Sequence, residues 1–240
     1  MPGRGIVLHA IAYSDRSDIV HLYTDDRGRI ASPVSYSRGR RNVLSRGLFI
    51  PLSVLEIEFA KHSSRNLYRM EECRLSFPTP MLSIHPVKNA ISLFMAELLY
   101  RILQEGQRDE PLFEYLSGSV HFLEHTGKGI ENFPLVFLLG LLHYLGIYPD
   151  RKTYRQGYYF DMVNGIFIGL IPGHPDYLSQ DESNHLSKLL RLSYEDMELD
   201  SFSLDARVQL LGDILRYYRL HLPSFPKLRS LSVMQSFGLG

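Results

Sequence analysis

Hydrophobic and polar residues alternate along the first 75 positions in the manner of β-strands. The clearest alternation lies in 49–59, where Leu55, Ile57 and Phe59 are separated by single glutamates. A period of two places successive side chains on opposite faces of a strand. Five such runs occur, at 6–12, 17–23, 29–37, 49–59 and 68–75. Turn-rich links join them without an intervening helix, so the pattern predicts a small five-stranded barrel of the OB-fold type.

The hydrophobic period changes to 3.6 after Pro78 and Pro80, which can continue neither a strand nor the interior of a helix. Apolar stripes then predict helices near 86–106, 111–127, 132–146, 185–192 and 204–222. Asn132 is the expected N-cap of the third helix, which is apolar almost all round and therefore central. The tail from Pro223 is polar and is expected to fray.

These patterns predict an α+β chain of two domains. Residues 1–78 form an OB-fold-like nucleic-acid-binding domain, and residues 81–240 form a helical bundle. A small irregular insert at 150–180, rich in Tyr and Gly, interrupts the bundle and contains a hairpin with Asn164-Gly165 at its turn.

The composition indicates a folded protein of a reducing compartment. Hydrophobic residues make up 45% and charged residues 22% of the chain. The single cysteine, Cys73, can form no internal disulfide and excludes a zinc site built on cysteine pairs. No stretch approaches the ~18–20 apolar residues of a membrane span, and no secretory pattern opens the sequence. A cytoplasmic location is therefore expected.

The formal net charge of zero hides an asymmetry. Residues 1–80 contain twelve basic and eight acidic side chains, whereas residues 81–150 contain four basic and eight acidic ones. A local basic excess favours an anionic partner, although arginines that merely solvate a small β domain would give the same composition.

Four arginines, Arg38, Arg40, Arg41 and Arg46, fall within nine residues that also contain Gly, Ser and Asn. The guanidinium fork matches phosphate oxygens, and small neighbours let the backbone come close. A basic loop between barrel strands predicts a sequence-independent nucleic-acid groove, with Tyr36 and Phe49 as flanking stacking faces. The alternative is a solvated hairpin loop. The candidate DNA-binding residues are Arg27, Arg29, Arg38, Arg40, Arg41, Arg46, Lys61 and Arg65.

Motifs of catalysis are missing from the sequence, which contains no GxxxxGK[ST], GxSxG or HExxH pattern. Cys73 has Glu71 and Glu72 beside it, and carboxylates make a thiol less nucleophilic. His121 and His125 share one helix face and could bind a metal, but no third ligand is evident. We therefore expect no catalytic residue and no metal site.

Several segments in order resemble the RecO family of bacterial recombination mediators. They are Gly5-Ile6-Val7-Leu8-His9, residues 13–20, Arg38-Gly39-Arg40-Arg41, Leu112-Phe113, residues 142–150 and residues 221–230. Many members of that family hold a four-cysteine zinc site. Here Thr153, Gln156, Ile168 and Ile171 occupy the corresponding places, so the zinc site is expected to be lost and no cofactor remains. An apolar cluster of Tyr154, Tyr158, Phe160, Phe167 and Ile168 is expected to replace it.

The resemblance implies a non-enzymatic DNA repair protein of the bacterial cytoplasm and nucleoid. Such a protein binds single- and double-stranded DNA, anneals complementary strands, and helps load the RecA recombinase together with RecR. It also contacts the acidic C-terminal tail of the single-strand DNA-binding protein, whose carboxylate would meet one of the few cations of the central helices (Lys88, Arg101, Arg108 or Lys128). The alternative reading is a protein-interaction adaptor that does not bind DNA.

Overall fold

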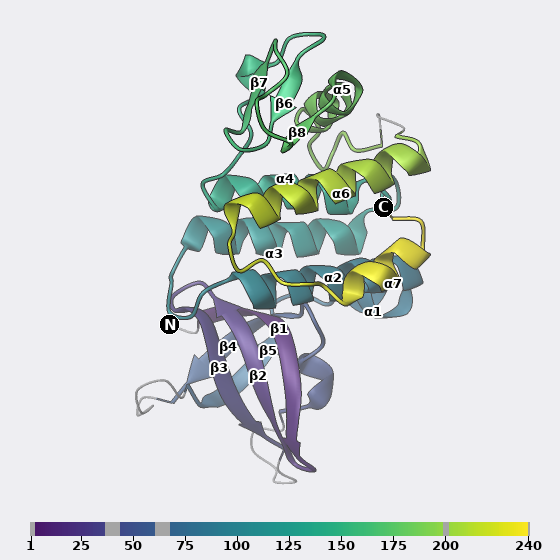
Figure 1. Cartoon of the computed structure of the whole chain (residues 1–240). Helices are drawn as coiled ribbons and strands as arrows, with labels where there is room; N and C mark the ends of the chain where they lie inside the picture. Colours follow the sequence, from purple (N-terminus) through teal and green to yellow (C-terminus); the bar gives the residue numbers. More distant parts are fainter. Residues whose placement is uncertain (1–2, 37–43, 61–67, 199–201, 240) are drawn as a thin grey trace. The chain divides into compact units, whose positions relative to one another are not determined.

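The computed structural model describes residues 3–36, 44–60, 68–198 and 202–239 of the 240-residue chain. The chain forms two compact units (Figure 1). One consists of Met1–His125 with Leu228–Ser230, and the other consists of Thr126–Lys227 with Leu231–Gly240. An antiparallel sheet followed by helices confirms the α+β class. The compact units are not the predicted domains, because the first unit contains three helices as well as the sheet. The division into domains at 1–78 and 81–240 stays a prediction.

Five antiparallel strands build the sheet of the first unit in the order β3-β2-β1-β4-β5. They are β1 (Gly3–Ser14), β2 (Ser17–Thr24), β3 (Gly28–Ser35), β4 (Val54–Phe59) and β5 (Met70–Leu75). The central strand β1 pairs with β4 over Gly3–Ile6 and with β2 along nearly its whole length. Leu8 is an extra residue in the pairing with β2, and such a bulge bends the strand where it leaves β4. The resulting layout is OB-fold-like.

The core of the sheet contains the residues that the alternation selects. Val20 and Leu22 of β2, Ile30 and Val34 of β3, and Ile57 of β4 are all buried in one cluster. The expected fourth strand from 49 to 59 is wrong in its first half. A short 3₁₀-helix, η1 (Arg46–Leu48), precedes a turn, and Leu52 adopts a positive φ of 66° that no strand residue can have. The strand therefore begins at Val54.

Three helices complete the first unit: α1 (Pro80–Ile84), α2 (Pro86–Ile102) and α3 (Glu110–His125). Prolines begin α1 and α2, as expected of a residue that lacks a backbone N–H. The turn between β2 and β3 touches the link between α2 and α3, because Gly28 approaches the backbone of Gln107 too closely for any side chain. Gly28 also has a φ of 68°, which glycine adopts without strain.

The second unit contains α4, the insert and the C-terminal helices. Its elements are α4 (Phe133–Tyr144), β6 (Tyr159–Asp161), β7 (Ile166–Ile168), β8 (Tyr177–Leu178), α5 (Gln180–Leu189), α6 (Leu204–His221) and most of α7 (Ser230–Ser236). The predicted hairpin is present as β6 and β7, with Gly165 at a positive φ in the turn. Phe167 packs against Tyr154 and Phe160 at ring-centroid distances of 5.1 and 4.8 Å, so aromatic packing supports the insert.

The structure corrects three details of the predicted helices and tail. Asn132 occupies the N-cap position of α4 as expected, but its buried side chain makes no capping hydrogen bond and donates instead to the Met197 carbonyl at 2.8 Å. Helix α5 begins at Gln180, earlier than the apolar stripe indicates, because Ser179 and Glu182 form a capping box. The tail is not frayed: it forms α7, in which Met234 is fully buried. Among the described residues, no helix is long and apolar enough to cross a membrane.

Candidate nucleic-acid interface

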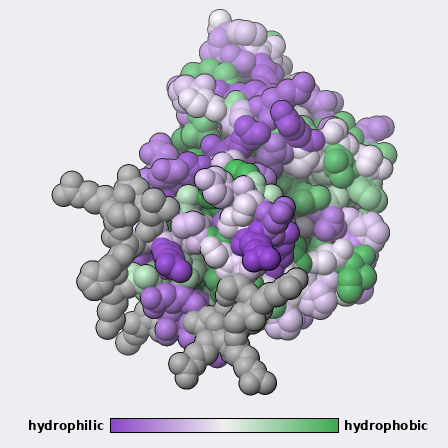
Figure 2. All heavy atoms as spheres, turned by 90° about the horizontal axis from the view of Figure 1, so that it is seen from below, coloured by the Kyte–Doolittle hydropathy of each residue, from purple (hydrophilic) through white to green (hydrophobic). Residues whose placement is uncertain are grey.

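The free end of the sheet is the hairpin that joins β1 to β2 (Figure 1). The hydroxyl groups of Ser14 and Ser17 lie 2.5 Å apart across the hairpin. Residues 11–16 are all exposed, so this end of the hairpin extends beyond the core of the sheet. Viewed from the side on which the hairpin lies, the surface mixes hydrophilic and hydrophobic patches (Figure 2).

Arg46 attaches the segment that follows residues 37–43 to this hairpin. Its Nη2 donates to the carbonyls of Ser14 and Asp15, both at 3.3 Å, and to the Asp18 carboxylate at 3.1 Å. The guanidinium also lies 5.0 Å above the Tyr36 ring. Arg46 therefore neutralises the buried Asp18 and holds the chain that leaves the arginine-rich segment.

Tyr36 attaches the chain that enters the same segment. Its backbone N–H donates to the Arg16 carbonyl at 2.8 Å, and its hydroxyl donates to Asp18 at 2.7 Å. Burial, followed by the contact with Asp18, raises the pKa of Tyr36, so the hydroxyl stays a donor at all physiological pH values. Both flanks of residues 37–43 are thus fixed to one hairpin.

The predicted DNA-binding residues divide into two groups. Arg38, Arg40, Arg41, Lys61 and Arg65 lie outside the described residues and stay predictions. Arg27, Arg29 and Arg46 are described, and all three have partners inside the protein. The structure brings Arg46 to the β1–β2 hairpin. Arg27 and Arg29 both lie at the turn between β2 and β3, which is at the other end of these strands.

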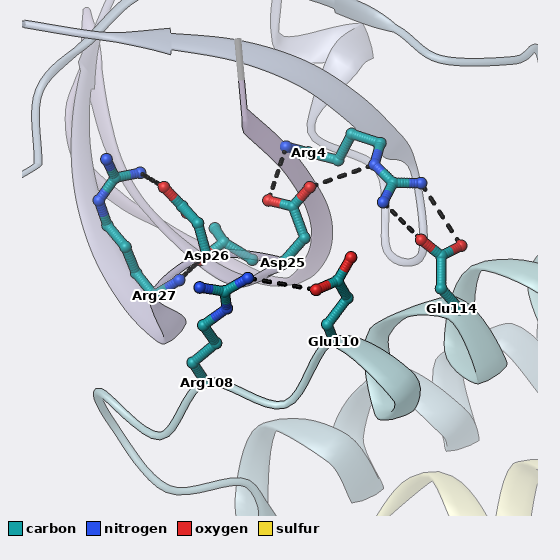
Figure 3. Close-up of polar contacts among 8 residues, drawn as sticks. Arg4, Asp25, Asp26, Arg27, Arg108, Glu110 and Glu114 are labelled. Carbon is teal, nitrogen blue, oxygen red and sulfur yellow. Dashed lines mark hydrogen bonds and ion pairs between the residues drawn. The ribbon is translucent and has the colours of Figure 1, made fainter. Parts of the chain in front are cut away.

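Arg27 and Arg29 are held by internal contacts. Arg27 pairs with Asp26 at 2.7 Å, as Figure 3 shows, and its guanidinium lies 4.9 Å above the Phe59 ring. Arg29 donates to the Tyr100 carbonyl at 2.6 Å and pairs with Glu105 at 3.2 Å. These contacts stabilise the first unit, and each of the two arginines already has a carboxylate partner, so neither offers an uncompensated charge to a phosphate.

A neighbouring network joins β1 to the turn after β2 and to α3. Arg4 donates from Nε to Asp25 at 3.2 Å and from Nη2 to Glu114 at 2.5 Å (Figure 3). Its guanidinium also lies 4.9 Å from the centre of the Phe113 ring. Arg108 pairs with Glu110 beside it at 3.2 Å. Each arginine of this network is balanced by a carboxylate, so the region provides little net positive charge.

The expected stacking faces are wrong. Phe49 is 4% exposed and belongs to the core of the sheet, and Tyr36 is covered by Arg46. The exposed aromatic residue of the hairpin is Tyr13, which the sequence pattern does not single out. The sequence gives little indication that Tyr13 is exposed, because a tyrosine in an alternating strand can face either the core or the solvent. Arg16 beside it is exposed, and its guanidinium has no ion pair within the described part of the chain.

The candidates for catalysis and metal binding have structural explanations. Burial raises the pKa of the Cys73 thiol to about 11, which leaves it a protonated and weak nucleophile. The His121 and His125 rings are tilted by 31° with their centres 4.3 Å apart, and Nδ1 of His125 is 2.8 Å from the His121 carbonyl. Within the described ranges, no group of three or more His, Cys, Asp or Glu side chains could hold a metal ion.

The four cations expected near the central helices, Lys88, Arg101, Arg108 and Lys128, also have partners within the protein. Lys88 is buried, and its ammonium donates to the Glu124 carbonyl at 2.6 Å. The other three pair at the surface with Glu97, Glu110 and Glu198. Of the four, Lys88 is the least accessible to a partner from solution.

Comparisons with known proteins agree with this architecture. The RecO N-terminal family model matches residues 2–78, and the RecO C-terminal model matches residues 85–153. The chain is similar to the DNA repair protein RecO of Phocaeicola vulgatus, with 41% identity over 96% of both chains. It is 40% identical to that of Bacteroides fragilis, again over 96% of each, and 33% identical to that of Porphyromonas gingivalis over 97% of each.

The OB-fold-like sheet followed by helices, matched by recombination-protein models in both parts, defines a DNA repair and recombination protein. The chain belongs to the RecO family.

Proposed function

We propose that this protein is a non-catalytic recombination mediator that binds single- and double-stranded DNA at the hairpin end of its sheet. One observation supports this site above others. The two flanks of the arginine-rich segment, Tyr36 and Arg46, are both fixed to the β1–β2 hairpin. Between these flanks the sequence contains three arginines, Arg38, Arg40 and Arg41, and no acidic residue, so we expect their charge to act at this end of the sheet.

The proposed binding is electrostatic and independent of base sequence. Arginine forks neutralise phosphates and release the counterions condensed on DNA. Neutralised backbones repel each other less, so two complementary strands held on basic surfaces can approach and pair. This accounts for strand annealing without any catalytic group.

The family membership supports the proposed partners. In the cytoplasm, at the nucleoid, the protein would act with RecR on DNA coated by the single-strand DNA-binding protein, contact the tail of that protein, and help RecA to load. The helical parts of the chain would provide the protein contacts, because the excess of basic residues lies in the first 80 positions.

The test is a triple variant, Arg38→Ala with Arg40→Ala and Arg41→Ala. Arg46 is kept because its loss would leave the buried Asp18 without its ion-pair partner. We expect weaker binding to all DNA sequences alike, and a salt slope lower by roughly 0.7 per lost phosphate contact on single strands. Arg74→Ala is the matched control, since Arg74 is an exposed arginine paired with Glu56 on the sheet.

Fluorescence anisotropy with a labelled single strand and a duplex, at several salt concentrations, measures both quantities. If wild-type protein binds neither DNA, the protein is an adaptor and the proposed function is wrong. If the triple variant keeps wild-type affinity and slope, the arginine-rich segment is a solvated loop and the DNA site lies elsewhere.

A further inference from the structure

Three exposed cations stand close together in sequence at the start of the insert: Arg151, Lys152 and Arg155. The first two belong to a short 3₁₀-helix, η2 (Arg151–Thr153), and the third follows soon after it. In the part of the chain that the structure describes, the ion pairs of the second unit involve other cations. The three side chains, which we call the insert patch, therefore present their charge to solvent without a carboxylate partner.

Few carboxylates surround the insert patch. Between 142 and 175 the sequence contains only two acidic residues, Asp150 and Asp161. Asp161 is buried in the turn between β6 and β7, and the Asp150 carboxylate accepts from the backbone N–H of Lys152 at 3.0 Å. Helix α5 bonds to the insert and adds one exposed acid, Asp181, and one exposed base, Lys188. Four exposed bases thus stand against two exposed acids, which leaves an excess of positive charge.

The backbone beneath the insert patch is fixed on both sides. The Thr153 hydroxyl accepts from the N–H of Phe167 at 2.8 Å, which joins η2 to β7. Nη1 of Arg155 donates to the carbonyls of Lys152 and Tyr154 at 3.2 and 2.7 Å, which closes the turn after η2. The chain that carries the cations is therefore ordered before any ligand arrives, so binding of an anion has a lower entropic cost.

The backbone of a nucleic acid is the anion that these observations favour. The chain belongs to a family of DNA repair and recombination proteins, so DNA is the polyanion that its cations meet. Adjacent exposed cations without carboxylate partners can neutralise successive phosphates. The described arginines of the first unit differ in this respect, because Arg4, Arg27, Arg29 and Arg46 are each paired with a carboxylate.

We propose that the insert patch binds the phosphate backbone of DNA and gives the second unit a DNA-binding surface of its own. The inference rests on the proposed function for the identity of the ligand. It does not depend on the arginine-rich segment, because the two surfaces share no residue. Contacts to phosphates read no base, so the patch binds all sequences alike. Two such surfaces on one chain would let it hold two strands, as annealing requires.

The test is a double variant, Arg151→Ala with Lys152→Ala. Arg155 is kept because it closes the turn. The matched control is Arg191→Ala with Lys227→Ala, which also removes one arginine and one lysine at exposed positions of the second unit. Anisotropy with labelled oligo(dT) should show a salt slope lower by roughly 1.4 for two lost phosphate contacts, and binding weaker by roughly 5-fold per contact at about 0.1 M salt. The control should bind like wild type, and all three proteins should unfold at the same temperature.

The outcomes separate this inference from the proposed function. If the double variant keeps wild-type affinity and slope while the triple variant at 38, 40 and 41 loses them, the insert patch is a solvated surface and the proposed function stands. If the double variant and its control lose affinity equally, the effect is one of overall charge and the inference is wrong. It is also wrong if the double variant binds DNA normally but no longer binds labelled polyglutamate, because the partner is then an acidic protein. If wild-type protein binds no DNA, both proposals are overturned together.

Discussion

Arg29 of strand β3 donates a 2.6 Å hydrogen bond to the carbonyl of Tyr100 in the last turn of α2. Its guanidinium also lies 5.3 Å from the centre of the Tyr100 ring, and its backbone carbonyl accepts from the N–H of Gly106 at 3.2 Å. A positive charge near the C-terminal end of a helix interacts favourably with the helix dipole. Arg29 thus links the sheet to the helices of the first unit.

This contact predicts that Arg29 contributes to stability rather than to DNA binding. Arg29→Ala removes a charge-assisted hydrogen bond and leaves the Tyr100 carbonyl without this donor, so the free energy of unfolding should fall by about 1–3 kcal/mol. Urea denaturation measures this change. Arg16→Ala, at an exposed arginine, is the control and should change stability by about 0.5 kcal/mol or less. A variant at Arg29 with normal stability but a lower salt slope for DNA would contradict the assignment.

The sheet could be predicted from the sequence because its strands are half buried and alternate cleanly. The exception is the start of β4, where the positive φ of Leu52 is imposed by a backbone contact with β1: Leu52 donates to the Val7 carbonyl at 2.7 Å. Leucine gives no local signal for such a conformation, so the pattern extended the strand too far.

The candidate site was less predictable for a different reason. The guanidinium fork that suits a phosphate also suits a carboxylate or a carbonyl. The partner that each arginine binds depends on the folded structure. Arg29 binds Tyr100, which is distant in sequence, and Arg46 binds a hairpin whose position the alternation alone cannot predict. The sequence therefore identifies the cations but not their partners, and it does not distinguish the exposed Tyr13 from a packed strand residue.

The insert is predicted to be stable without zinc. Thr153 donates to the Asp150 carbonyl at 2.7 Å and accepts from the Phe167 N–H at 2.8 Å, so a hydroxyl group cross-links the start of the insert to β7. Elemental analysis should find no stoichiometric zinc, and dialysis against a chelator should leave the melting temperature unchanged. One zinc per chain after such dialysis, or a lower melting temperature, would contradict this.

Asp161 holds the turn between β6 and β7 as a carboxylate. Burial by itself would raise its pKa, but hydrogen bonds from Asn164 and Val163 and the nearby His174 outweigh burial, so the pKa is lowered. A lowered pKa means that the ionised form stabilises the fold above the ordinary pKa of Asp, and that this stability is lost as the pH falls through the folded pKa.

Asp161→Asn should therefore destabilise the protein at pH 7 by about 1–3 kcal/mol, because the amide presents an N–H group where the turn needs acceptors. The difference from wild type should shrink as the pH is lowered toward 3. Urea unfolding across this range gives the comparison. A difference that is constant with pH would show that the lost stability does not come from the charge.

Asp213 of α6 is the opposite case. It is 7% exposed and lines a small cavity with Phe160, Leu186 and Tyr217. Burial raises its pKa to about 6, against the opposing effect of a hydrogen bond from Gln209, which also donates to Glu182. The folded protein consequently binds a proton more tightly at Asp213 than the unfolded chain does.

The sign of the resulting pH dependence follows from this raised pKa. Asp213 imposes no cost below its ordinary pKa of 3.8, and its cost grows as the pH rises to about 6 and is complete above that value. Asp213→Asn removes the charge and keeps an acceptor for Gln209, so it should stabilise the protein at pH 7.5 by about 1–3 kcal/mol and have little effect near pH 4. Urea denaturation of both proteins at the two pH values measures the difference. Equal stability at pH 7.5 would mean that Asp213 is solvated and titrates as an ordinary carboxyl.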